Sequence, residues 1–283
     1  MIEVEDRDQI TVMRLNAPPV NALDREVLLA ITSTLREIAR SDARGVVLTG
    51  TASVFSAGAD LFRVLNEGDE YLRTSLAALT EAFGTLFEFP LPVVAAVNGH
   101  AIAGGAVLVC ASDYRVAAAG DHKIGFAELR VGVPFPAWAL EIARWGTRPE
   151  YLQEVIYLGR SYDPEGARER GLLDEIVPED RLIDRAIEMA ERLAAIPAIS
   201  FRLMKESLRQ AVGERVRSAE KADAAAREAW GSDEVRDAIH DIADEEEDDY
   251  ITPATDPTPP DVEITPPSPK VRRTARRSPS GNL

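Results

Sequence analysis

Two short apolar segments constrain the fold of this chain more than any other feature of the sequence. Gly45–Thr49 and Pro92–Val97 are each only five or six residues long, too short for a typical helix, and neither alternates between apolar and polar residues. Such segments are typical of strands that are buried on both faces in a parallel sheet, which requires helices on both sides. Ile10–Leu15 and Tyr114–Ala117 are two further predicted strands.

Helical patterns separate and follow these strands. Asp24 can cap a helix that runs to about Arg40, because apolar residues recur after it at helical spacing. A second helix is predicted from Glu70 to Glu88. From Glu150 onward the chain is predicted to be mostly helical, over about 150–158, 164–170, 179–195 and 200–230. Strands that alternate with helices and precede a helical region predict the α/β class.

Charge and proline content divide the 283 residues into two parts. The net charge of −16 includes −9 from residues 233–249 alone, and 8 of the 18 prolines lie in the last 34 residues. A self-repelling acidic block followed by proline-rich and basic sequence buries too little apolar surface to offset its ordering entropy. We therefore predict one domain over residues 1–243, in which about 196–243 form a helical C-terminal part, and a disordered tail over 244–283.

Composition excludes several classes of protein. No apolar run reaches the length of about 18 residues that a membrane-spanning helix needs, and the acidic start does not resemble a signal peptide. The single cysteine, Cys110, fits a reducing compartment, so we expect a cytoplasmic protein without a membrane partner. The negative charge argues against a nucleic acid partner, and no cluster of His, Cys and Asp predicts a metal site.

Two turns rich in small residues are the candidate functional site. Phe55–Leu61 follows one buried strand, and Asn98–Val107, with Gly104 and Gly105 at its centre, follows the other. Small residues allow a ligand to approach the backbone, and the start of a helix offers unpaired N–H groups. If the two turns face one another, they form an oxyanion hole; the alternative is a pair of tight packing turns. Neither turn matches a dinucleotide-binding or nucleotide triphosphate-binding loop.

These motifs resemble the enoyl-CoA hydratase/isomerase family, also called the crotonase superfamily. Asn16–Leu23, Ser112–Ala117 and Phe126–Gly132 resemble further segments of the family in the same order, as does the late stretch from Gly159 to Pro178. The likeness covers about residues 3–230. It implies a crotonase-like spiral of repeated β-β-α units with a helical C-terminal region, and an enzyme that stabilises an enolate-like anion of an acyl-CoA thioester.

The resemblance assigns roles to individual residues. The backbone N–H groups of Ala59 and Gly104 match the oxyanion donors, and Glu128 matches the second of two glutamates that hydratases of the family use as acid and base. Glu128 lies in an apolar stretch, where burial would raise its pKa toward the range of a general base. Without the resemblance, a solvated glutamate at the end of a strand would be the preferred interpretation.

The first family glutamate is missing, because Val107 occupies its position. Val107 cannot transfer a proton, so hydration by two carboxylates is doubtful, and an acidic dyad of the dienoyl-CoA isomerase kind is excluded. A single glutamate at Glu128 resembles the Δ3-Δ2-enoyl-CoA isomerase branch. Glu141 is a secondary candidate for the lost acid. An amphipathic packing helix around Trp138, Glu141 and Trp145 is the preferred interpretation of that segment.

The remaining expectations concern the ligand and the assembly. We expect no cofactor other than the coenzyme A of the substrate. The predicted substrate contacts come from both turns and from two basic side chains, for which an exposed, solvated charge is an equally good interpretation; these contacts are Ala57, Gly58, Asp60, Leu61, Arg63, Gly105, Val107 and Lys205. The family resemblance implies a homotrimer or hexamer. The function hypotheses are enoyl-CoA isomerisation, enoyl-CoA hydration in fatty-acid β-oxidation, and a non-catalytic acyl-CoA-binding or interaction protein.

Overall fold

The computed structural model describes residues 1–245, with side chains up to residue 241. Its main sheet has six strands in the order β1-β2-β4-β7-β9-β12. Only the β1–β2 pair is antiparallel, and the other neighbours are parallel. The strands are β1 (Ile2–Arg7), β2 (Ile10–Leu15), β4 (Gly45–Thr49), β7 (Val93–Val97), β9 (Tyr114–Ala118) and β12 (Glu175–Val177).

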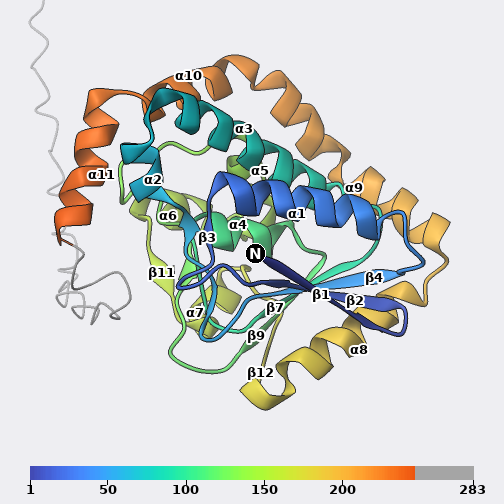
Figure 1. Cartoon of the computed structure of the whole chain (residues 1–283). Helices are drawn as coiled ribbons and strands as arrows, with labels where there is room; N and C mark the ends of the chain where they lie inside the picture. The colour runs from blue at the N-terminus through green and yellow to red at the C-terminus, as the bar shows by residue number, and fades with distance from the viewer. Residues whose placement is uncertain (246–283) are drawn as a thin grey trace, which may run out of the picture.

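Both faces of the main sheet are covered by helices (Figure 1). Val46 and Leu48 of β4 pack into a large core that includes helices α1 (Arg25–Ile38), α3 (Gly68–Phe87) and α4 (Gly104–Ala111), whereas Val47 packs into a second core with α8 (Leu182–Ala194). Successive side chains of a strand point to opposite faces, which explains why the segment has no charged position. The prediction of buried parallel strands is confirmed.

A smaller sheet accompanies the main one, in the order β11-β10-β8-β5. Its strands are β5 (Val54–Ser56), β8 (His100–Ile102), β10 (Ile124–Gly125) and β11 (Ser161–Tyr162). Strand β5 follows β4, β8 follows β7, and β10 follows β9, and each short strand leads toward a helix: α2 (Leu61–Asn66), α4 and α5 (Ala137–Gly146) respectively. This succession is the predicted spiral of β-β-α units.

The short strands and the division of the long C-terminal helix differ from the sequence prediction. We expected the glycine turns to join strand directly to helix, but β5 and β8 lie between. Three-residue strands are too short to produce a periodic pattern. The predicted helix 200–230 is two helices, α9 (Ala198–Ser218) and α10 (Glu220–Trp230), which meet at Ala219 without a glycine or proline to mark the break. The other C-terminal helices are α6 (Leu152–Leu158) and α7 (Pro164–Glu169).

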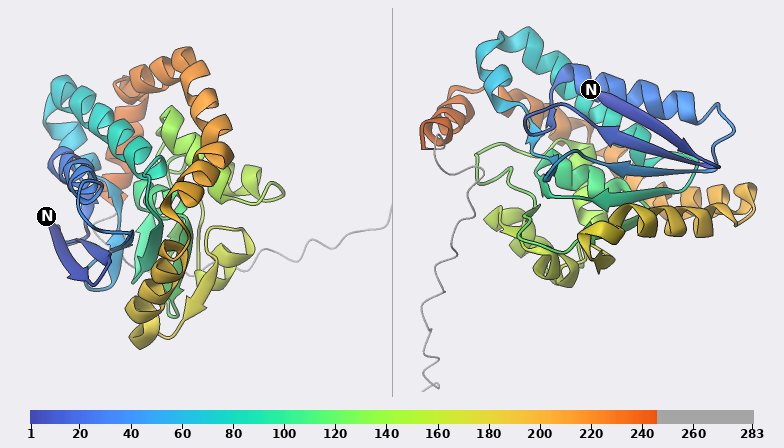
Figure 2. Two further views of the ribbon diagram at one scale, coloured as in Figure 1. Left: turned by 90° about the vertical axis from the view of Figure 1, so that its right-hand side faces the viewer. Right: turned by 60° about the horizontal axis from the view of Figure 1, so that its bottom comes forward.

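The last helices lie beside the N-terminal half of the molecule (Figures 1 and 2). Helix α10 contacts α3 and α5, and α11 (Asp233–Glu245) contacts α2. Their apolar side chains Trp230, Val235 and Ile239 form a third core with Val64 and Leu72. The predicted tail begins at residue 244, so α11 includes its first two residues, and 246–283 lie outside the described residues. In the described part of the chain, no helix has both the length and the apolar character needed to cross a membrane.

Candidate active site

Three segments that are distant in sequence leave the small sheet at the same edge. Strands β5, β8 and β10 run parallel, with His100 of β8 opposite Val54 and Ile102 of β8 opposite Gly125. The carboxyl ends of parallel strands meet at one edge of a sheet. The turn after Ser56, the turn at Ala103 and the segment that leads to Glu128 are therefore brought together, whereas the sequence alone left open whether the two turns face one another.

The two turns touch because glycine occupies the point of contact. Gly58 has a φ of +87°, and a Cβ atom there would lie 3.0 Å from the backbone nitrogen of Gly104. A side chain at Gly58 would therefore separate the turns. Gly104 is the first residue of α4, where the backbone N–H has no partner within the helix. Ala103, which precedes it, adopts a φ of +50°, a conformation that is uncommon for alanine.

The first turn continues directly into helix α2. Asp60 caps this helix by accepting the Arg63 backbone N–H at 2.9 Å, and Leu61 begins it. Ala59 lies just before the cap, in a two-residue strand paired with Ala22 and Leu23. Gly58, the residue before Ala59, therefore lies against the start of α4, which carries the Gly104 N–H. Two N–H groups in such turns are suited to stabilising negative charge on a single oxygen.

Glu128 is the buried carboxylate of this region. Its side chain is 7% exposed, and its Oε2 atom has no hydrogen-bond partner among the described residues. Burial away from water raises the pKa of Glu128 to about 8. The loop that holds it is closed by the Val133 N–H, which donates to the Glu128 carbonyl at 2.9 Å. A carboxyl group with this pKa can accept or donate a proton near neutral pH.

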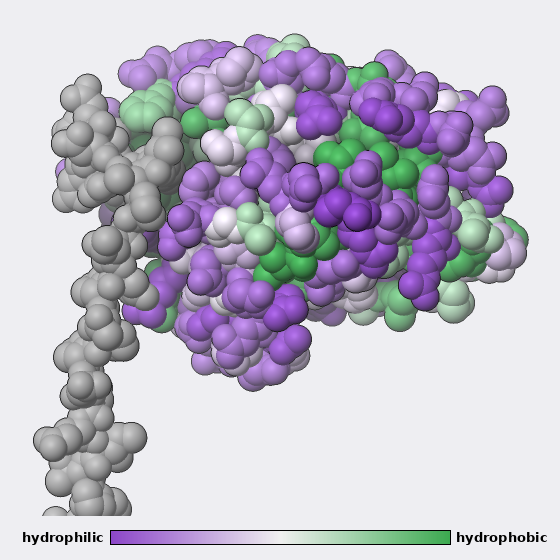
Figure 3. Space-filling model, turned by 90° about the horizontal axis from the view of Figure 1, so that it is seen from below, coloured by the Kyte–Doolittle hydropathy of each residue, from purple (hydrophilic) through white to green (hydrophobic). Residues whose placement is uncertain are grey.

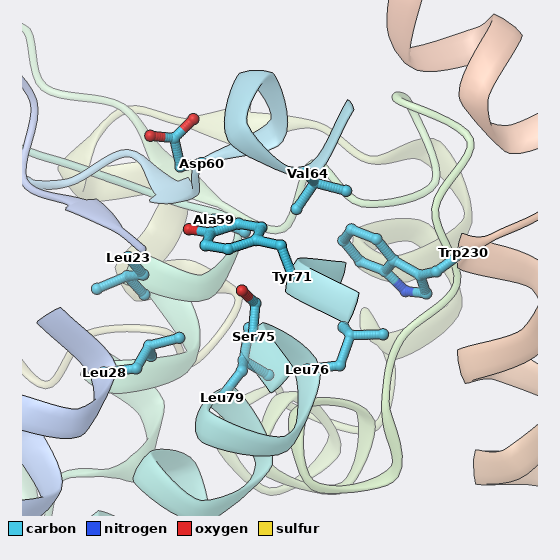
Figure 4. Close-up of a pocket in the computed structure, with 10 residues that line it drawn as sticks. All are labelled: Leu23, Leu28, Ala59, Asp60, Val64, Tyr71, Ser75, Leu76, Leu79 and Trp230. Atoms are coloured by element: carbon cyan, nitrogen blue, oxygen red, sulfur yellow. The ribbon is translucent and has the colours of Figure 1, made fainter. Parts of the chain in front are cut away.

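A largely apolar pocket opens beside Ala59 (Figure 4). It measures about 300 Å³ when the gaps between its side chains and the open space at its entrance are counted, and the part wide enough for a water-sized molecule is about 10 Å³. Its wall consists of Leu23, Leu28, Ala59, Asp60, Val64, Tyr71, Ser75, Leu76, Leu79 and Trp230. Glu128 does not line this pocket itself. Its loop is attached to the wall, because the Trp230 Nε1–H donates to the Pro134 carbonyl at 2.8 Å.

Glu141, the secondary candidate for proton transfer, lies on α5 and is also 7% exposed. In contrast to Glu128, its carboxylate is occupied by two arginines, Arg144 at 3.3 Å and Arg215 of α9. The Arg215 pair joins α5 to α9, whereas Arg144 lies on α5 itself, and both pairs favour the packing role. A role in catalysis stays a prediction without support from this geometry.

The two basic side chains expected at coenzyme A are both engaged within the protein. Arg63 pairs with Asp24, Glu26 and Glu67 and lies over the ring of Tyr71 at 4.7 Å. These contacts leave the guanidinium partly exposed at the edge of the pocket wall, so a contact with a phosphate stays a prediction.

Lys205 is only 7% exposed, so the interpretation as a solvated charge is wrong for this residue. Its Nζ donates to Asp113 at 2.7 Å and to the Leu91 carbonyl at 3.1 Å, and Arg209 shares the same carboxylate at 2.8 Å. This buried cluster anchors α9 to the main sheet.

The helix that begins in the second turn, α4, is wholly buried. Gly105 and Val107 lie within α4, where every residue is buried, and Cys110 is part of the same apolar helix. Burial raises the pKa of the Cys110 thiol to about 11, so it remains a protonated core residue. No group of three or more potential metal ligands occurs among His, Cys, Asp and Glu in the described residues.

The sequence did not predict most of the pocket wall. Tyr71 and Ser75 lie on the predicted helix α3, but the pattern of the helix indicated only that one face is buried. Trp230 closes the pocket from a helix more than 150 residues later in the chain. In the sequence, Trp230 is only an aromatic residue near the end of a predicted helix. That pattern does not indicate which residues Trp230 contacts.

Comparison with known proteins identifies the family. The family model for enoyl-CoA hydratase/isomerase matches residues 5–247. The chain belongs to the enoyl-CoA hydratase/isomerase family. This membership makes it an enzyme of the enoyl-CoA hydratase or isomerase type, and it confirms the crotonase fold predicted from the motifs.

Individual relatives support both branches of the family. The chain is 30% identical over 226 residues to mitochondrial enoyl-CoA delta isomerase 1 of Mus musculus, covering 79% of this chain and 78% of the relative. It is 34% identical over 214 residues to a putative enoyl-CoA hydratase of Thermus thermophilus, covering 74% of this chain and 83% of the relative. The crystal structure of human mitochondrial Δ3-Δ2-enoyl-CoA isomerase superimposes with a TM-score of 0.82 at 26% identity, covering 86% of this chain and 97% of that one.

Proposed function

We propose that this enzyme moves a double bond in an enoyl-CoA thioester from the C3–C4 to the C2–C3 position. Glu128, as the carboxylate, removes a proton from C2, and the electron pair of that C–H bond delocalises through the thioester onto its oxygen. The backbone N–H groups of Ala59 and Gly104 stabilise this dienolate. Glu128 then returns the proton to C4, so that the reaction is balanced without water or a second substrate.

The observation that carries this proposal is the buried carboxylate of Glu128, which, unlike that of Glu141, has no arginine beside it among the described residues. Among the described residues the Glu128 Oε2 atom has no hydrogen-bond partner, and burial raises the pKa of Glu128 to about 8. Val107, which is 0% exposed, fills the position at which the family's hydratases carry their other glutamate. One carboxylate is sufficient for a transfer from C2 to C4, whereas addition of water is assisted by two. The likeness to the mouse and human isomerases supports the same reaction.

The decisive experiment measures two reactions separately. A 3-enoyl-CoA is followed for double-bond migration, and crotonyl-CoA is followed for hydration, with wild type, Glu128→Gln and the control Glu141→Gln. We expect migration with little hydration in the wild type, and a fall in migration of about 10²–10⁴-fold in Glu128→Gln. Glu141→Gln tests whether the loss is specific to the unpaired carboxylate.

Migration that persists in Glu128→Gln would refute the assignment of the acid/base. Hydration as the faster reaction in the wild type would support the alternative function, enoyl-CoA hydratase, which the likeness to the Thermus thermophilus protein favours. The variant Val107→Glu restores the second carboxylate, and a gain in its hydration would show that this position alone separates the two reactions. Binding of CoA esters without turnover of either would indicate a non-catalytic binding protein.

The same proposal includes a homotrimer or hexamer. Helix α9 and the segment just before it expose large apolar side chains at roughly helical spacing, which are between 40% and 68% exposed: Ile196, Ile199, Leu203, Met204 and Leu208. Apolar patches interrupt the hydrophilic surface of the monomer (Figure 3). A contiguous exposed apolar stripe is typical of a subunit interface.

The assembly is tested by light scattering on Leu203→Glu and Leu208→Glu. The control is Leu29→Glu, because Leu29 is 48% exposed on α1, away from this stripe. We expect the α9 variants to dissociate and the control to keep the native mass. Native mass in all three would refute the role of α9.

The proposal extends to the cofactor and the compartment. Transfer of a proton within one substrate exchanges no electrons with a second molecule, so coenzyme A within the substrate is the only cofactor proposed. A cytoplasmic location is proposed from the single cysteine, Cys110, which is buried and reduced.

A further inference from the structure

Two hydroxyl groups face the otherwise apolar pocket beside Ala59. Tyr71 and Ser75 lie one turn apart on α3, are 5% and 8% exposed, and both line the pocket (Figure 4). Residues at this spacing lie on the same face of a helix. Apart from the Asp60 cap, the other side chains of the wall are apolar. The pair is therefore a polar spot within a surface suited to an acyl chain.

The Ser75 hydroxyl has no hydrogen-bond partner in the described part of the chain. A buried helical serine or threonine commonly bonds to the carbonyl one turn before it. Thr74 and Thr80 on the same helix do so, at 2.9 Å to Glu70 and 2.8 Å to Leu76. Ser75 does not. An unsatisfied buried hydroxyl costs about 1–3 kcal/mol, and that cost is recovered when a ligand supplies the missing partner.

Tyr71 leaves further hydrogen-bonding capacity at the same place. Its hydroxyl accepts a long hydrogen bond, 3.5 Å, from the Arg25 backbone N–H. Burial raises the pKa of Tyr71 above its ordinary value, so the phenol stays protonated. Even if one hydroxyl of the pair donates to the other, the second proton remains available to an acceptor. The spot can therefore donate to an oxygen atom of a ligand.

We propose that Ser75, with Tyr71 beside it, receives an oxygen atom carried by the acyl chain itself, beyond the thioester carbonyl. The preferred substrates are then acyl-CoA thioesters with a hydroxyl or carbonyl group on the chain. This inference rests on the proposed function, because it assumes that the pocket beside Ala59 holds the acyl group. When the Tyr71 and Ser75 hydroxyls bond to each other, one proton of the pair still lacks an acceptor, and a purely hydrocarbon chain cannot supply one. Sites built to form a hydrogen bond discriminate strongly against ligands that lack it.

The test compares two 3-enoyl-CoA substrates of equal chain length, one ending in a methyl group and one carrying a hydroxyl, with the hydroxyl position varied along the chain. The quantity of interest is the ratio of kcat/KM values for the oxygenated and plain substrates. For the best position we expect a ratio of about 10 in the wild type, corresponding to one hydrogen bond of about 1.4 kcal/mol. In Ser75→Ala we expect the ratio to fall to about 1, and in Ser75→Thr to recover.

The matched control is Thr80→Ala, which removes a hydroxyl of the same helix that is already satisfied by Leu76; its ratio should equal that of the wild type. Ser75→Ala is expected to fold, since alanine favours a helix and an unsatisfied group is removed. Equal ratios in wild type and Ser75→Ala would overturn the proposal, as would a wild-type preference for plain chains. The latter result would indicate that water fills the spot.

Binding separates this proposal from the reaction. Kd values of saturated acyl-CoAs, with and without the hydroxyl, are measured by calorimetry on the wild type and Ser75→Ala. A preference of the wild type that disappears in Ser75→Ala supports the polar subsite even if no isomerisation occurs. Equal affinities refute it even if isomerisation is confirmed.

Discussion

Replacement of Glu128 by glutamine should make the folded protein more stable while it removes activity. Burial raises the pKa of Glu128 from 4.5 to about 8. Between these two values the folded state keeps a proton that the unfolded state releases. The unfolding free energy therefore falls as pH rises through this interval, by about 1.4 kcal/mol for each pH unit. Glutamine has a similar shape and never ionises, so it escapes this cost.

At pH 7 the accumulated difference amounts to about 3 kcal/mol. Glu128→Gln should be more stable than the wild type by that amount at pH 7, by more at pH 8, and by little at pH 5. Urea unfolding monitored by circular dichroism at these three pH values measures the difference. The control Glu141→Gln changes a glutamate with the same 7% exposure whose carboxylate is paired with Arg215 and Arg144. It should lower stability by about 1–3 kcal/mol.

A Glu128→Gln variant that is no more stable than the wild type at pH 7 would refute the reasoning. The same holds for a difference that does not grow from pH 5 to pH 8. The activity of the wild type supplies a second measurement. Because the carboxylate form must accept the proton, kcat/KM for double-bond migration should rise with pH and level off above about pH 8.

Three further predictions concern the turns, the buried ion cluster and the pocket wall. Gly58→Ala should lower kcat/KM for migration by about 10²–10³-fold, because the new Cβ would separate the two turns, while the circular dichroism spectrum stays unchanged; unaltered kinetics would contradict the oxyanion geometry. Asp113→Asn leaves Lys205 and Arg209 buried without their shared carboxylate, and should reduce the unfolding free energy in urea by about 3–5 kcal/mol; a loss below 1 kcal/mol would show that the cluster is solvated. Trp230→Ala should reduce the unfolding free energy by about 3–5 kcal/mol in the same assay and raise kcat/KM for longer acyl chains. A chain-length preference unchanged from the wild type would exclude Trp230 as the end of the pocket.

The buried strands and the two turns could be predicted because their signals are local. Strands buried on both faces exclude charged residues over five positions, as in Gly45–Thr49. Asp24 caps its helix through a contact three residues away, at 2.7 Å to the Val27 N–H. The contact between Gly58 and Gly104 excludes side chains, so the small residues mark it in the sequence. The family resemblance added Glu128 and the arrangement of the units.

The tertiary structure alone decided which charged and polar groups are available for chemistry. Glu128 and Glu141 are equally buried, but only Glu141 meets an arginine 74 residues away. Lys205, expected at the ligand, is bound to an aspartate 92 residues away. The Ser75 hydroxyl makes no hydrogen bond to a backbone carbonyl of the described residues and lines a pocket whose wall includes Trp230. Whether a side chain is paired depends on residues from distant parts of the chain. A short-range sequence pattern does not indicate which distant residues come into contact.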